Sequence, residues 1–233
     1  MKGASDSSAP GEDVRSLYPF LYHGTSGSPT AAALMAQVRE STVDKVCAAI
    51  RLREEVFERD RRRLVDCAEA MAERFAHGGR LLAFGNGGSS TDAQDLASLF
   101  LSPAGEARPL PAFGLTNDIA VITALSNDIG FNAVFSRQVA AFGRGGDIAV
   151  GLSTSGNSAN LVPAFEEASR RGLLTVGFAG DDGGRMAELE SIDHLFVVPS
   201  SSVHRIQEAQ TTLYHVLWAL TLTALDGERP VKR

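Results

Sequence analysis

Two turns of the sequence carry residue types that could hold an anion. The turn Gly85–Ser90 (GNGGSS) follows the apolar run Leu81 to Phe84, and the turn Ser153–Ser158 (STSGNS) follows the apolar run Ile148 to Leu152. Glycine lets the backbone approach an oxyanion closely, hydroxyls donate hydrogen bonds to it, and the N–H groups at a helix N-terminus carry partial positive charge. A helical pattern follows each turn directly. The two turns together predict a phosphate site that needs no lysine.

Nucleotide binding and simple helix capping fit these turns less well. The first turn lacks the third glycine of the dinucleotide fingerprint, and the chain has no Gly-x4-Gly-Lys-[Ser/Thr] motif, so neither NAD nor ATP is indicated. A single Ser/Gly turn would indicate only a capped helix start, because Ser and Asn are common caps. Two such turns at equivalent places in successive strand–helix units favour phosphate binding.

The elements that must position these turns alternate between short apolar runs and helical stretches. We predict strands at Leu81 to Phe84, Pro111 to Leu115, Ile148 to Leu152, Leu174 to Phe178 and Leu195 to Val198. Helices are predicted at Thr91 to Leu101, Asp118 to Ser126, Phe131 to Phe142, Asn157 to Arg171, Gly184 to Glu190 and Val203 to Leu225. This α/β pattern indicates a five-stranded, mostly parallel, doubly wound sheet with helices on both faces. Ligands bind such sheets beyond the carboxyl ends of the strands.

The N-terminal part of the chain has a different composition. Residues up to about Pro29 are rich in Ser, Gly and Pro and are predicted to form a flexible arm. From Ala31 to Ala76 there is no Pro or Gly, and apolar residues recur three and four apart. We predict a hairpin of two long helices here, ending at Gly78-Gly79.

Composition narrows the function classes. The chain carries 22 Lys+Arg against 28 Asp+Glu, and this acidic balance argues against direct nucleic-acid binding. No apolar run is long enough to span a membrane, and there is no secretory signal pattern, so a soluble cytoplasmic protein is expected. Cys47 and Cys67 form no metal or disulfide motif.

Several motifs, taken together, resemble the sugar isomerase (SIS) domain proteins and, within them, the phosphoheptose isomerases. The resemblance runs from about Ala31 to Leu225. Besides the two turns it rests on Asp92-Ala93, Leu125–Asp128, Gly130-Phe131, Phe135–Val139, Gly146-Asp147, Asp182–Gly184 and Arg205–Glu208. It implies a five-stranded parallel sheet flanked by helices, and homotetramers with sites at subunit interfaces. The expected organisation is an arm (1–29), the SIS domain with its N-terminal helices (30–227) and a tail (228–233).

The resemblance also implies roles for individual residues. The side chains expected to hold the sugar phosphate are Ser89, Ser153, Thr154, Ser155 and Ser158. Asn86, Asp128 and Gln207 are expected to contact the sugar.

The metal site of the phosphoheptose isomerases is only half present. In that family a His and a Glu four residues apart, together with a Gln and a His eight apart on the last helix, hold zinc. Gln207 and His215 match the second pair, but the first pair reads Asp95 and Leu99. A leucine can neither bind zinc nor act as the general base that aldose–ketose isomerisation needs. Zinc is therefore not expected, and Asp95, Gln207 and His215 would be its only ligands.

Two further positions depart from the family. An Arg after the metal-site helix is replaced by Pro103, and the Asp before Arg-Ile-Gln-Glu is replaced by His204. We therefore favour a protein that binds a phosphosugar without zinc-dependent catalysis and acts through a protein partner, as the replication-initiator-associating relatives do. The alternative is an active phosphoheptose isomerase, converting sedoheptulose 7-phosphate to D-glycero-D-manno-heptose 7-phosphate, in which His215 is catalytic. An enzyme of amino-sugar phosphates is a third hypothesis.

Overall fold

The computed structural model describes residues 31–103 and 107–227, in two units that meet between Val46 and Cys47. The predicted arm (1–29) and tail (228–233) lie outside the described residues, so the predicted division into arm, domain and tail stays a prediction. Within the described ranges, no helix is long and apolar enough to cross a membrane.

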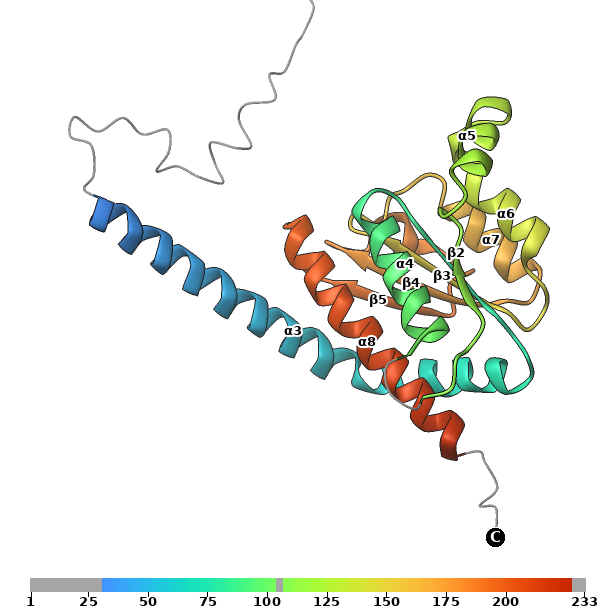
Figure 1. Ribbon diagram of the computed structural model, residues 1–233, viewed down its shortest axis with the longest axis horizontal. Helices are drawn as coiled ribbons and strands as arrows, with labels where there is room; N and C mark the ends of the chain where they lie inside the picture. Colours follow the sequence, from blue (N-terminus) through green and yellow to red (C-terminus); the bar gives the residue numbers. More distant parts are fainter. Residues whose placement is uncertain (1–30, 104–106, 228–233) are drawn as a thin grey trace, which may run out of the picture. The chain divides into compact units, whose positions relative to one another are not determined.

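The second unit is built around one parallel sheet (Figure 1). The elements in chain order are α3 (Ala31–Ala76), β1 (Leu81–Gly85), α4 (Gly88–Leu101), β2 (Ala112–Gly114), α5 (Ile119–Asp128), η1 (Phe131–Ala133), α6 (Val134–Phe142), β3 (Ile148–Ser153), α7 (Val162–Arg170), β4 (Leu174–Gly180), η2 (Gly184–Glu188), β5 (His194–Val198) and α8 (Val203–Gly227). The strand order is β2-β1-β3-β4-β5, and every neighbouring pair is parallel. The predicted five-stranded α/β sheet is confirmed, with each strand within two residues of its predicted bounds.

Both faces of the sheet are covered by helices. On one face, alternate residues of the strands pack with side chains of α3, α4 and α8. On the other face, the intervening residues pack with α6, α7 and η2. In β3, for example, Val150 belongs to the first cluster and Ala149 to the second. Burial on both sides explains why the strands are near-continuous apolar runs.

The predicted N-terminal helical hairpin is wrong, because α3 is one continuous helix of 46 residues. No Gly or Pro interrupts Ala31 to Ala76, so nothing in the backbone stops a helix once it has formed. The end at Gly78 was predicted correctly. Gly78 has a φ of +86° and donates its N–H to the Phe75 carbonyl, while Gly79 donates to the Arg74 carbonyl, a glycine-dependent helix end.

Two helices near the carboxyl ends of strands are shorter than predicted. α7 begins at Val162 instead of Asn157, because Pro163 has no N–H to donate and is tolerated in the first turn of a helix but not in its interior. Residues Gly184 to Glu188 form a 3₁₀ turn in place of the predicted α-helix. The second hydroxyl-rich turn therefore does not lead directly into a helix N-terminus.

The edge strand β5 is covered by arginines of α3. Arg59 donates a hydrogen bond to the carbonyl of Val197, and Arg63 donates to the carbonyl of Leu195 at 2.8 Å. Asp60, which is 3% exposed, forms ion pairs with both arginines. These contacts fasten α3 to the sheet through main-chain carbonyls that would otherwise face solvent.

Candidate functional site

The two hydroxyl-rich turns lie at the point where the strand order reverses. From β1 the chain crosses to β2 on one side of the sheet, and the later strands β3, β4 and β5 are added on the other side. β1 and β3 are hydrogen-bonded neighbours, with Gly85 paired with Leu152 at their carboxyl ends. Such a reversal opens a crevice at the strand ends, which is where doubly wound sheets bind ligands.

The first turn joins β1 directly to α4. Gly87 has a φ of +56°, and the N–H of Ser89 donates to the Asn86 carbonyl at 3.0 Å. The hydroxyl of Ser89 has no hydrogen-bond partner among the described residues, so it is available to a ligand at the N-terminus of α4.

Asn86 ties the first turn to the chain beyond the second turn. Its amide nitrogen donates to Asn160 at 2.8 Å, and the Asn160 amide nitrogen donates back at 2.9 Å. Asn160 is 1% exposed. Asn86 was predicted to contact the sugar, and in the structure its side chain is engaged by this reciprocal pair.

The second turn is organised by its own hydroxyls. The Ser153 and Ser158 oxygens lie 3.0 Å apart, and the Ser155 hydroxyl accepts a hydrogen bond from the Asn157 N–H at 3.2 Å. The Thr154 hydroxyl has no partner within the described ranges. Three of the predicted phosphate ligands thus shape the turn. The Ser155 hydroxyl, and whichever of the Ser153 and Ser158 hydroxyls accepts in their shared hydrogen bond, keep a proton to donate to an oxyanion.

A third turn, after β4, supports the second. Gly156 has a φ of +64°, and a Cβ atom there would overlap the carbonyl of Gly183. A Cβ at Gly184 would lie 2.6 Å from both the Asn157 amide nitrogen and the Ser155 carbonyl oxygen. The Asn157 side chain bridges the two turns by accepting from the Arg185 N–H at 3.0 Å. Glycines after β4 are therefore required by this close approach.

Carboxylates of α4 meet polar side chains of α8 beside the first turn. The Gln207 amide nitrogen donates to Asp92 at 2.8 Å, and the Tyr214 hydroxyl donates to Asp95 at 2.7 Å. Burial, helped by the negative charge of Asp95, raises the pKa of Asp92, although the hydrogen bond from Gln207 opposes that shift. Burial and the hydrogen bond to Asp95 raise the pKa of Tyr214, so this phenol stays protonated.

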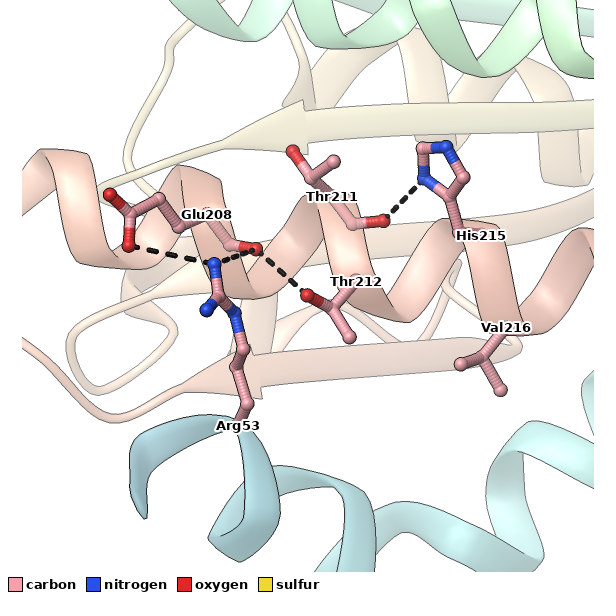
Figure 2. A pocket seen from close by; sticks show the side chains of 6 residues that line it. All are labelled: Arg53, Glu208, Thr211, Thr212, His215 and Val216. Carbon is pink, nitrogen blue, oxygen red and sulfur yellow. Dashed lines mark hydrogen bonds and ion pairs between the residues drawn. The ribbon is translucent and has the colours of Figure 1, made fainter. Parts of the chain in front are cut away.

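His215 lies on the wall of a groove between α3 and α8 (Figure 2). The groove measures about 470 Å³ and is lined by Arg53, Glu208, Thr211, Thr212, His215 and Val216. The Nδ1 atom of His215 is 2.8 Å from the Thr211 carbonyl oxygen. Because a carbonyl only accepts, Nδ1 carries the proton in the neutral ring and Nε2 is the acceptor.

Other residues singled out from the sequence are not joined to the turns by any hydrogen bond of the described residues. Asp128 ends α5, is exposed, and accepts from the Asn127 amide at 2.8 Å. His204 is exposed near the start of α8, and Pro103 follows α4. Leu99 packs against the core.

Three residues of the site had no role predicted from the sequence. Each forms a side-chain hydrogen bond with a residue more than 70 positions away in the chain; the three are Asn160, Asp92 and Tyr214. One signal for Tyr214 existed, since it lies seven residues from Gln207 and so shares its side of α8. Nothing comparable marked Asn160.

Comparison with known proteins assigns the family. A model described as the SIS domain matches residues 46–180. This chain belongs to the SIS domain family. It is 46% identical over 190 residues to a phosphoheptose isomerase of Desulfovibrio desulfuricans, an alignment that covers 79% of this chain and 89% of that protein. It is 43% identical over 187 residues to a phosphoheptose isomerase of Roseiflexus sp., covering 80% and 94%.

A solved structure agrees with this placement within the SIS domain proteins. The phosphoheptose isomerase of Neisseria gonorrhoeae superposes with a TM-score of 0.72 at 36% identity, covering 82% of this chain and 99% of that one. The resemblance drawn from the motifs is therefore confirmed.

The zinc that the resemblance implies does not fit the residues present. Leu99 has no donor atom, and Asp95 has a shorter side chain than the His that the resemblance implies at its position. Among residues 31–103 and 107–227, no group of three or more His, Cys, Asp or Glu side chains is placed to hold a metal ion. Structural and catalytic zinc sites use three or four protein ligands with suitable geometry. The absence of zinc from this protein stays a prediction.

Proposed function

We propose that this SIS domain protein is an aldose–ketose isomerase of sugar phosphates, converting sedoheptulose 7-phosphate to D-glycero-D-manno-heptose 7-phosphate. The observation that carries the proposal is the position of the two hydroxyl-rich turns, side by side at the strand reversal between β1 and β3. Relatives at 43% and 46% identity are phosphoheptose isomerases, which supports the enzyme over the binding-only protein that the sequence alone favoured.

The side-chain hydroxyls of the two turns bind the phosphate group. The Ser89 and Thr154 side chains have no partner among the described residues, and Ser153, Ser155 and Ser158 line the second turn. Oxygen and nitrogen donors fixed by backbone geometry hold an anion without the flexibility of a lysine. The phosphate then anchors the sugar chain, so that its reacting carbons stay in one place.

Isomerisation moves a proton between the carbonyl carbon and its neighbour. A base removes a proton from C1 of the ketose and the C2 carbonyl oxygen gains one, which gives the enediol; the O1 hydroxyl then loses its proton as a proton returns to C2, which leaves the aldose. Leu99 cannot act as this base. The Nε2 atom of His215 is an acceptor in the neutral ring, and we propose that it accepts the proton and returns it. We further propose that Gln207, held by Asp92, contacts the sugar and that Asp128 does so as well.

A second candidate function is binding without turnover. Leu99 favours it, because the position implied as the family's general base holds a hydrocarbon side chain. In that case the sugar phosphate would act as a signal read by a protein partner.

One experiment separates these functions. The purified protein is mixed with sedoheptulose 7-phosphate, and the aldose product is followed by NMR while binding is followed by thermal shift. Turnover that His215→Asn removes, with binding retained, supports the isomerase. Binding without turnover supports the second candidate. Absence of a thermal shift with this sugar phosphate and with inorganic phosphate would overturn both.

The assembly and compartment belong to the proposal too. We propose that the protein is cytoplasmic and that it forms a homotetramer. The reason for the assembly is that α3 carries apolar residues with exposed fractions of 47% to 66%, namely Met35, Val43, Val46 and Ile50. Apolar side chains that recur along one helix usually mark a subunit contact. Light scattering that shows a stable monomer at micromolar concentration would contradict it.

A further inference from the structure

One stripe of α4 faces α8. Gly88, Asp92, Asp95 and Leu99 are spaced four, three and four residues apart, which places them on one side of a helix. A Cβ atom at Gly88 would lie 2.5 Å from the amide nitrogen of Gln207, so α8 approaches the first turn of α4 closely. Leu99, at the other end of the stripe, packs with the core between the helices and the sheet.

Two hydrogen bonds close the middle of this junction. Gln207 donates to Asp92 at 2.8 Å, and Tyr214 donates to Asp95 at 2.7 Å. Tyr214 is 1% exposed, so water can hardly replace Asp95 as the hydrogen-bond acceptor of its hydroxyl. Asp95 is exposed, so this hydrogen bond lies at the edge of the junction with its donor buried, and the carboxylate is a stronger acceptor than a neutral group.

The same positions of α4 and α8 are where the resemblance implies zinc. A metal held by two helices cross-links them. Here the position of one implied ligand is Asp95, one carboxylate oxygen of which accepts a hydrogen bond from Tyr214, and the position of another is Leu99, which has no lone pair.

We propose that the Tyr214–Asp95 and Gln207–Asp92 hydrogen bonds replace a metal ion as the cross-link between α4 and α8. The fold of this protein is then independent of zinc. This inference goes beyond the proposed function, because it holds whether or not the protein turns over its sugar phosphate.

The first test uses thermal unfolding of the full chain with and without chelator. The unmodified protein should contain less than about 0.1 zinc per chain by mass spectrometry and should keep its melting temperature in EDTA. Asp95→Ala should lower the melting temperature by about 5 °C, and added zinc should not restore it. Asp95→Asn is the matched control, because its amide oxygen still accepts from Tyr214, and it should retain most of the stability.

A second variant gives the converse test. Asp95→His combined with Leu99→Glu should bind about one zinc per chain with Gln207 and His215, and its melting temperature should fall in EDTA. Zinc at one ion per chain in the unmodified protein, with melting that falls on chelation, would overturn the proposal. So would an Asp95→Ala variant as stable as the unmodified protein, or a double variant that takes up no zinc.

Discussion

The two halves of the candidate site differ in how their polar groups are used. In the hydroxyl-rich turns, the side-chain hydroxyls of Ser89 and Thr154 have no hydrogen-bond partner among the described residues, and Gly87 has open space where a side chain would lie. At the α4–α8 junction, both carboxylates accept hydrogen bonds from within the protein. One half is therefore prepared for an anion from outside, whereas the other is satisfied internally. The difference indicates that the turns and the α4–α8 junction can be altered separately by substitution.

The largest effect is expected from blocking the second turn. Gly156→Ala should lower the free energy of unfolding by about 3 kcal/mol, because it places a side chain at positive φ and against the Gly183 carbonyl. Gly78→Ala is the control, since Gly78 also has a positive φ but open space around it, and should cost about 1 kcal/mol. Urea denaturation measures both. Equal losses would show that the contact between the turns is unimportant.

The amide pair that ties the turns together should show coupling. Asn86→Ala leaves the buried Asn160 amide without its partner and should destabilise by about 2 kcal/mol. The double variant Asn86→Ala/Asn160→Ala should lose less than the sum of the single losses, because no amide is then left unpaired. Additive losses in the denaturation series would argue against the reciprocal pair.

The two halves should separate in a binding measurement. Ser158→Ala should weaken the affinity for sedoheptulose 7-phosphate about 10-fold, through loss of a donor to the phosphate. Asp95→Asn should leave that affinity within about twofold, because its hydrogen bond lies outside the turns. Calorimetry measures both, with the exposed Ser169→Ala on α7 as control. If Asp95→Asn weakened affinity as much as Ser158→Ala, the division into two halves would be wrong.

The smallest effect concerns pH and a residue away from both halves. Burial lowers the pKa of His194, at the start of β5, although Asp193 and Asp66 oppose that shift. The unfolded chain then binds more protons than the folded one as the pH falls below about 6.5, so the free energy of unfolding decreases there. His194→Gln should flatten this dependence, and the exposed His77→Gln should not. A slope unchanged by His194→Gln would assign it to another group.

Local signals in the sequence were sufficient for the sheet. Leu81 to Phe84 and Ile148 to Leu152 are apolar because both faces of the sheet bury them, and that requirement is visible in the chain itself. The start of α7 depended on Pro163, whose missing N–H fits only the first turn of a helix, and this outweighed the helical pattern from Asn157.

The hydrogen-bonded pairs of the candidate site could not be predicted from local signals in the sequence. Ser89 and Ser153 could be expected at one edge of the sheet, because the carboxyl ends of all strands in a parallel sheet lie at the same edge. The partners of Asn86 and Asp95 could not, because Asn160 and Tyr214 are brought to them by packing of whole elements. Asn86 was assigned to the sugar for this reason, although its amide is engaged within the protein.

The arginine cover of β5 limits how copies of this protein can associate. A bare edge strand can recruit a strand from another molecule and extend the sheet, which is a common route to aggregation. Arg59 and Arg63 occupy the carbonyls of Val197 and Leu195, and they bring two positive charges to that edge. A strand arriving from a second molecule would first have to displace both guanidinium groups and leave the buried Asp60 unpaired. These contacts therefore disfavour growth of the sheet from the β5 edge.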